Sequence, residues 1–76
     1  MNHKLVAYRK LLNLKQKEVA DVIGINSATF SQKERGTRDF TQSEMIAITE
    51  LFQTKIPDIT MHDIFFKDDV SRLLSS

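Results

Sequence analysis

Apolar residues recur along this chain at intervals of three and four positions, the spacing of one helix face, and no stretch alternates as a strand does. The first such stripe consists of Leu5, Tyr8 and Leu12. It predicts a helix that Asn2 caps and that runs to about Leu12. Asn13 tolerates a left-handed backbone and is expected to end this helix.

Residues 16–36 read as two short helices joined by a tight turn. The first carries a compact apolar stripe of Val19, Ala20 and Ile23, and Ala20 is small where the two helices must cross closely. Gly24 follows directly, where a helix most often ends, because a residue without Cβ takes a positive φ at no steric cost. The pattern therefore predicts a helix that Gln16 opens and Gly24 stops.

A second helix is expected to begin at Asn26 or Ser27, since both are N-cap residue types. Phe30 should anchor this helix to the core, and Gly36 should end it. Two helices in this arrangement are typical of the helix-turn-helix, in which the second helix lies in the major groove of DNA. The pattern thus predicts that the helix at about residues 27–34 reads a duplex.

The C-terminal half contains two capping boxes, in which a hydroxyl and a carboxylate each satisfy an orphan backbone N–H. The first, at residues 41–44, predicts a helix over about residues 42–52. Pro57 then requires a connection, because it cannot continue a helix. The second box, at residues 60–63, predicts a short fifth helix that includes residues 64–65.

These patterns together predict an all-α domain of five helices around one core, over residues 1–66. Residues 67–76 are expected to form a C-terminal tail or one more amphipathic turn. Outside the two central helices, the side chains expected in the core include Leu5, Tyr8, Leu12, Leu14, Met45, Ile48, Leu51, Phe52, Ile56, Ile59 and Phe65.

The composition excludes several classes of protein. A chain of 76 residues holds one modest core, with little room for a deep substrate cavity. There is no cysteine, His3 and His62 are isolated, and no Gly-rich phosphate loop occurs, so we expect no enzyme, cofactor or metal site. Met1 precedes polar residues and no apolar run approaches the ~18 residues that span a bilayer, so we expect neither a secretory signal nor a membrane span. The expected location is cytoplasmic, with the nucleoid.

The net charge of +1 conceals an asymmetry between the two halves of the chain. Residues 1–38 carry eight basic and three acidic residues, a net +5, whereas residues 39–76 carry three basic and seven acidic residues, a net −4. The basic half contains the helix-turn-helix pattern. This suits a face that binds a polyanion, backed by an acidic face, although chance clustering on a solvated surface is the alternative.

The span from about residue 3 to residue 66 resembles the Cro/repressor-type, Xre-like helix-turn-helix family. The residues that carry the resemblance are Leu14, Gln16, Val19, Ala20, Ile23, Gly24, Ile25, Thr29, Phe30, Ser31, Glu34, Arg35, Gly36, Asp63, Ile64 and Phe65. Residues 39–52, together with residues 63–66, look especially like small Cro-like regulators of phages from Gram-positive hosts. The resemblance implies a compact, five-helix, lambda-repressor-like DNA-binding domain that usually acts as a dimer on an inverted-repeat operator.

The resemblance also implies roles for individual residues. Ser27, Ala28 and Gln32 match positions that face base edges, and a Gln amide can pair with adenine in a bidentate manner. Arg9 and Glu34 match a pair that often forms an internal salt bridge. The candidates for phosphate contact or positioning are Lys15, Gln16, Thr29, Lys33, Arg35, Thr37 and Arg38.

Two of these positions depart from the family's usual pattern. Position 33 is usually apolar, and Lys33 could either extend along the edge of the core or point toward phosphate. Ala28 offers no hydrogen bond where many relatives place Gln or Arg, which weakens direct readout at that base, although its methyl group can pack on a thymine methyl.

The function predicted from the sequence is a sequence-specific transcriptional regulator, a Cro-like repressor or genetic-switch protein. Its predicted partners are double-stranded DNA and a second copy of the chain, with a dimer surface that involves the fifth helix and an exposed Phe66. Two alternatives share the fold. One is a protein that acts mainly by binding another regulator, as an anti-repressor or co-repressor does, and the other is the antitoxin of a toxin–antitoxin pair.

Overall fold

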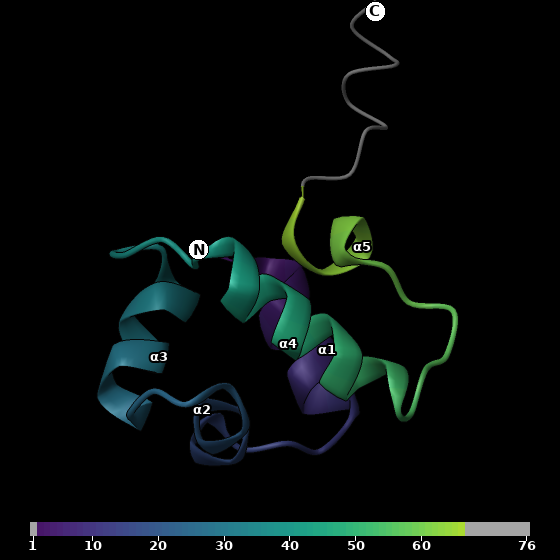
Figure 1. Cartoon of the computed structure of the whole chain (residues 1–76), viewed down its shortest axis with the longest axis horizontal. Helices are drawn as coiled ribbons and strands as arrows, with labels where there is room; N and C mark the ends of the chain where they lie inside the picture. The colour runs from purple at the N-terminus through teal and green to yellow at the C-terminus, as the bar shows by residue number, and fades with distance from the viewer. Residues whose placement is uncertain (1, 67–76) are drawn as a thin grey trace, which may run out of the picture.

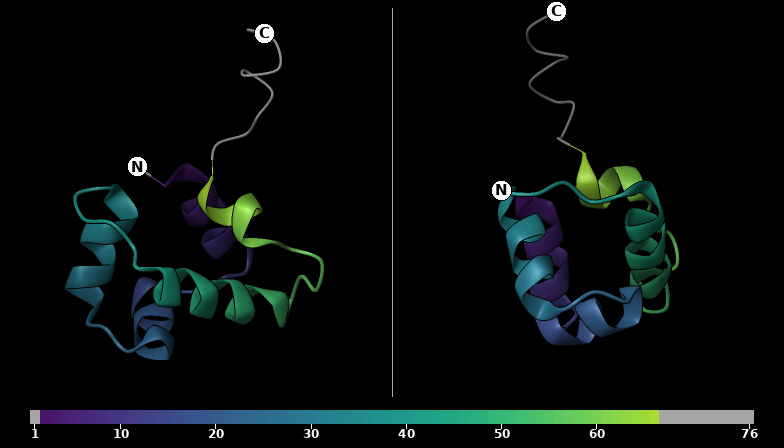
Figure 2. Two further views of the ribbon diagram at one scale, coloured as in Figure 1. Left: turned by 45° about the horizontal axis from the view of Figure 1, so that its top comes forward. Right: turned by 60° about the vertical axis from the view of Figure 1, so that its left-hand side comes forward.

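The computed structural model of the protein describes residues 2–66, and within that range it contains five helices and no strand. The helices are α1 (His3–Leu11), α2 (Gln16–Ile23), α3 (Ser27–Arg35), α4 (Gln42–Gln53) and α5 (Met61–Phe65). The all-α, five-helix prediction is confirmed, while the expected tail at residues 67–76 lies outside the described range. In Figure 1, α3 lies at one edge of the molecule, and Figure 2 shows α5 on the side opposite α2.

Short-range side-chain bonds begin three of the helices, as predicted. Asn26 caps α3, since its side-chain oxygen accepts the backbone N–H of Thr29 at 2.7 Å. Both capping boxes form: the hydroxyls of Thr41 and Thr60 each accept the N–H three residues later, and the carboxylate at that later position accepts the N–H of the threonine. These bonds satisfy backbone donors that a helix N-terminus leaves without partners.

The first two helices begin differently. Lys15 has no acceptor to offer at the start of α2, but the Glu18 carboxylate accepts the Lys15 backbone N–H at 2.9 Å, which supplies half of a capping box. The prediction that Asn2 caps α1 is wrong for the side chain, which makes no cap bond to that helix. The Asn2 side chain instead donates at 3.0 Å to the carbonyl oxygen of Lys33 in the last turn of α3, an oxygen that also accepts the Gly36 N–H at 3.1 Å.

Left-handed residues end the first three helices where the sequence predicted. Asn13 has φ 59° just beyond α1, and Gly24 and Gly36 have φ 82° and 90°. At Gly24 the chain turns so tightly that the Ala20 carbonyl accepts two N–H groups, from Gly24 at 2.9 Å and from Ile25 at 3.0 Å. The turn satisfies the end of α2 and fixes the angle at which α3 departs.

The core lies where the five helices meet and contains the predicted Phe30 anchor. The fully buried or nearly buried apolar side chains are Leu5, Val19, Ala20, Phe30, Ile48, Phe52, Ile59 and Ile64. Phe40, in the connection after α3, joins this core by edge-to-face contacts with Phe30, at 5.8 Å between ring centroids, and with Phe65, at 5.4 Å. In the described part of the chain, no helix combines the length and apolar character needed to cross a bilayer.

Replacing Gly24 should measure the backbone strain of the turn alone. A Cβ built at this position meets no atom within 4 Å, so Gly24→Ala should lower the free energy of unfolding by about 1 kcal/mol through its left-handed φ of 82°. Gly24→Asn should cost less, because Asn adopts this backbone more readily. Urea denaturation of both variants tests the prediction, and equal losses for Ala and Asn would contradict it.

Candidate nucleic-acid interface

Helix α3 has an inner face that is buried and an outer face that is open to solvent. Phe30, Lys33 and Glu34 are buried on the inner side. Ser27 and Ala28 are exposed at the first turn. Because α3 lies at the edge of the molecule, its outer face is free for a large partner (Figure 1).

The inner face is held by a buried ion pair between α1 and α3. Arg9 donates to both carboxylate oxygens of Glu34, from Nε to Oε2 at 2.7 Å and from Nη2 to Oε1 at 3.1 Å. The two side chains are only 10% and 4% exposed. The structure thus contains the internal salt bridge that the family resemblance implied, in the bidentate geometry that Arg favours.

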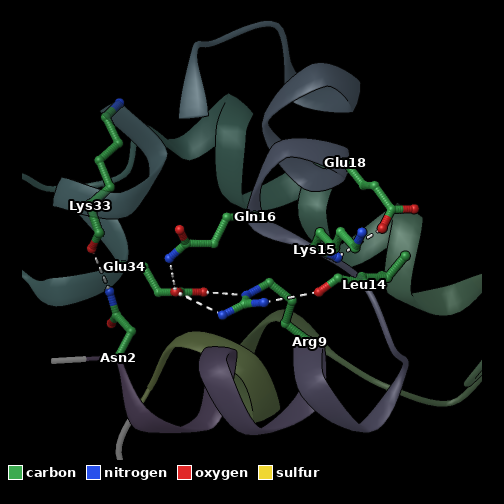
Figure 3. A network of polar contacts seen from close by, with 8 residues as sticks. All are labelled: Asn2, Arg9, Leu14, Lys15, Gln16, Glu18, Lys33 and Glu34. Atoms are coloured by element: carbon green, nitrogen blue, oxygen red, sulfur yellow. Dashed lines mark hydrogen bonds and ion pairs between the residues drawn. The ribbon is translucent and has the colours of Figure 1, made fainter. Parts of the chain in front are cut away.

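Further hydrogen bonds complete this pair and draw in α2 (Figure 3). The Gln16 amide donates to Glu34 Oε1 at 2.8 Å, so one carboxylate joins α1, α2 and α3. The remaining arm of Arg9 donates from Nη1 to the carbonyl of Leu14 at 2.9 Å. Asn2 adds its backbone N–H to the Glu34 carbonyl at 3.0 Å. No buried side-chain nitrogen or oxygen among residues 2–66 lacks a hydrogen-bond partner, as a stable buried charge requires.

Lys33 takes part in a second buried ion pair, which argues against the phosphate contact that the sequence left open for it. Its Nζ donates to Glu44 Oε1 at 2.6 Å, and the two side chains are 8% and 12% exposed. A buried ammonium already paired with a carboxylate is not free to reach phosphate. The other possibility left by the sequence, that Lys33 stays at the edge of the core, agrees with its burial.

The pKa of the Glu44 carboxyl is shifted in opposite directions by its burial and by its partners. Burial acts to raise its pKa, but the hydrogen bond from Lys33, the backbone N–H of Thr41 and the Lys33 charge outweigh burial, so the pKa of Glu44 is lowered from its ordinary value. Glu44 is therefore charged at neutral pH and holds both the ammonium of α3 and the first turn of its own helix.

The structure brings the candidate base readers together on the first two turns of α3. Ser27 and Ala28 are exposed, and Gln32 and Thr29 are half-buried. The Gln32 amide makes no hydrogen bond within residues 2–66, so its donor and acceptor groups remain available. Thr29 contributes its backbone N–H to the cap of its own helix.

Most of the candidate phosphate contacts lie exposed at the two ends of the helix-turn-helix. Lys15 precedes α2, whereas Arg35, Thr37 and Arg38 lie at or beyond the end of α3. Gln16 is half-buried, and one N–H of its amide is engaged with Glu34, so its second N–H and its oxygen are left for another partner. Among the described residues, no group of three or more His, Cys, Asp or Glu side chains could hold a metal ion.

Sequence reasoning missed two of the contacts that hold α3. The Lys33–Glu44 pair joins residues 11 positions apart on different helices, and the Asn2–Lys33 bond spans 31 positions. The signal for the first was present, because a lysine at a position that is usually apolar needs a carboxylate. Nothing local to Asn2 indicated its partner.

Comparison with known proteins agrees with the helix-turn-helix arrangement of α2 and α3. The Helix-turn-helix family matches residues 5–59 of the chain. A protein of Methanocaldococcus jannaschii, named as an uncharacterized HTH-type transcriptional regulator, is 33% identical over 63 residues, which cover 83% of this chain and 96% of that protein. No solved structure matches the chain significantly.

Removing Arg9 should leave the buried carboxylate of Glu34 without its charged partner. Arg9→Met keeps most of the side-chain volume but leaves Glu34 with the Gln16 amide in a site where only 4% of the Glu34 side chain is exposed. We expect a loss of about 3–5 kcal/mol in the free energy of unfolding, measured by urea denaturation.

The matched control is Lys17→Met, which breaks the Lys17–Asp21 pair on the surface of α2, where the two side chains are 76% and 64% exposed. That pair should contribute at most about 0.5 kcal/mol. Similar losses for Lys17→Met and Arg9→Met would contradict a special role for the buried pair.

The lowered pKa of Glu44 predicts that the free energy of unfolding decreases at acidic pH. Because the folded-state pKa lies below the ordinary value of 4.5, the contribution is complete above that value and is lost as the pH falls through the folded pKa. Asp63 adds a dependence of the same sign, since its bonds from the backbone N–H and the hydroxyl of Thr60 lower its pKa. Glu44→Gln should flatten the loss of stability that occurs as the pH falls below 4.5, and thermal melts at a series of pH values measure that loss.

The control for this measurement is Glu50→Gln, at an exposed position of α4 that forms no ion pair within residues 2–66. Its pH profile should follow that of the wild-type protein. If Glu44→Gln retained the full wild-type loss in acid, the ion pair would not be the source of the dependence.

Proposed function

The chain belongs to the helix-turn-helix family, and from this we propose that it is a sequence-specific transcriptional regulator that reads the major groove of DNA with α3. Family membership and the named relative support a DNA-binding regulator. The observation that carries the finer proposal is the division of α3 into a buried, doubly anchored inner face and an exposed outer face of short side chains. Such a face can approach base edges closely.

Base recognition is assigned to three side chains. Gln32 can pair with adenine N7 and N6 through its amide, which makes no bond within the described chain. Ser27 can bond to either base type, and the Ala28 methyl can pack against a thymine methyl. Ser27 and Ala28 are exposed, which supports these roles. The expected half-site therefore contains at least one A·T pair opposite the middle of α3.

Phosphate contacts would position the domain on the duplex. Lys15 at the start of α2 and Arg35 and Arg38 beyond the reading face are exposed cations that flank α3 at both ends. Gln16, Thr29 and Thr37 are the polar candidates between them. Arg9 and Lys33 are left out of this set, since both are buried in ion pairs.

We further propose that the protein acts as a homodimer on an inverted-repeat operator, as a Cro-like repressor or switch protein does. One reading helix buries too little surface for tight specific binding, and two helices about 34 Å apart would supply it. A groove of about 280 Å³ is lined by the apolar residues Phe40, Met45, Phe65 and Phe66 and by the polar residues Asn2, Arg38 and Asp39. Phe66 is 48% exposed. An exposed aromatic side chain beside this groove supports self-association, and sedimentation as a monomer at high micromolar concentration would exclude it.

A second candidate function is binding to another regulator, as an anti-repressor or co-repressor. Two observations favour it: Ala28 lacks a hydrogen-bonding group on the reading face, and the groove beside Phe66 could receive a partner protein. Under this function, Gln32→Ala would leave activity intact, and the protein would co-purify with a partner repressor.

DNA footprinting on the region upstream of the protein's own gene tests the proposal. We expect a protected site whose affinity falls steeply with salt, because each neutralised phosphate releases counterions. Gln32→Ala should reduce discrimination at one base pair by about 1–3 kcal/mol. Arg38→Ala should weaken binding to all sequences and reduce the salt slope by about 1.

The matched control is Lys55→Ala, which removes an exposed lysine from the connection between α4 and α5, at the far end of the molecule from α3 (Figure 1). This variant should bind as the wild-type protein does. The absence of a protected site together with a flat salt slope would overturn the proposed function.

A further inference from the structure

Two consecutive charged residues near the end of α3 are buried, and they pair with different parts of the molecule. Glu34 is held by Arg9 of α1 and Gln16 of α2. Its neighbour Lys33 is held by Glu44 of α4. Figure 3 shows the Lys33 side chain extending away from the Arg9–Glu34 pair. The last turn of α3 is therefore attached in two directions at once.

Because of helix geometry, these two attachments restrict the rotation of α3 about its own axis. Consecutive residues are about 100° apart around a helix axis, because one turn takes 3.6 residues. A single attachment leaves a helix able to rotate about that contact. Two attachments that leave the axis in different directions determine the rotation of the helix about its own axis.

The second attachment joins two helices whose backbones make few close approaches to each other. The backbone of α3 lies mainly against α2 and comes near that of α4 at few positions. Residues 35–39, which continue from the end of α3 toward α4, are exposed. The Lys33–Glu44 pair bonds the end of α3 directly to the start of α4, and the contact between Phe30 and Phe40 joins α3 to the connection that precedes α4.

The Glu44 carboxylate that binds Lys33 is also held by its own helix. The oxygen that accepts the Lys33 ammonium, Oε1, also accepts the backbone N–H of Thr41 at 2.9 Å in the α4 capping box. The carboxylate is thus bonded to the first turn of α4 and to Lys33 at the same time. A directional bond to a fixed acceptor restrains α3 more narrowly than contact between apolar side chains would.

We infer that Lys33 and Glu44 are positioning residues, whose ion pair sets the rotation of α3 and thereby the register of its reading side chains on DNA. Base contacts tolerate errors of only about 10–20°. Stability alone does not require the ion pair, because apolar residues of similar volume often serve as well or better in a buried site. The inference rests on the proposed function, since it concerns how α3 reads bases.

The test compares the double variant Lys33→Met, Glu44→Gln with Thr41→Ala. The double variant removes both charges, so the net charge is unchanged, and Gln at position 44 still offers an oxygen to the Thr41 N–H. Thr41→Ala removes the hydroxyl that accepts the Glu44 N–H but leaves the ion pair. Each variant is assayed at a temperature at which circular dichroism shows it folded, on the footprinted site and on a scrambled duplex.

The double variant should lose about tenfold in the ratio of specific to non-specific affinity, the equivalent of one good base contact. Its affinity for the scrambled duplex and its salt slope should not change. Thr41→Ala should melt about 4–8 °C lower and keep the wild-type ratio. An unchanged ratio in the double variant would overturn the inference, as would a lower salt slope, which would mean that Lys33 contacts phosphate after all.

Residual dipolar couplings of the free proteins separate this inference from the proposed function. The orientation of α3 relative to α4 should differ between the double variant and the wild-type protein. If the wild-type protein prefers no duplex, the proposed function fails and the couplings alone decide: an altered orientation supports the positioning role of the pair, and an unaltered one overturns it.

Discussion

The buried pair between Arg9 and Glu34 is the interaction on which the placement of the other elements depends. Removing two charges from water costs several kcal/mol for each ion, and this cost is offset only where the geometry is good and the remaining donors and acceptors are bonded. Here both carboxylate oxygens and three guanidinium nitrogens have partners, which belong to α1, α2, α3 and the loop after α1. Satisfying this one pair therefore requires three helices to meet in a single arrangement.

That requirement explains why the outer surface of α3 can consist of short side chains that are exposed to solvent. Its inner side carries Phe30 and two charged residues that bond to three other helices, so its position does not depend on what the outer side contains. The short side chains of Ser27 and Ala28 can then take the base-reading roles proposed for them, because buried contacts hold the backbone behind them in place. Left-handed glycines before and after α3, at positions 24 and 36, complete the restraint.

The structure shows that fewer basic residues of the N-terminal half are available to a partner than their number in the sequence indicated. Eight basic residues among residues 1–38 indicated a broad basic face. Arg9 and Lys33 are neutralised inside the protein, and Lys17 pairs with Asp21 on the surface. The exposed cations that flank α3 are Lys15, Arg35 and Arg38, a smaller set at defined ends of the helix-turn-helix. Net charge by halves thus indicated the correct class of partner but overstated the number of contacts available to it.

The sequence alone determined the helices, their ends and the helix-turn-helix, because caps, capping boxes and left-handed residues act over four or five neighbouring positions. Asn26, Thr41, Thr60, Gly24 and Gly36 all behave as their local chemistry predicts. The tertiary structure alone decided what Asn2 and Lys33 do, since their partners lie 31 and 11 positions away on other elements. A long polar side chain bonds to whatever the fold brings within about 3 Å of it, and no local pattern specifies which group that will be.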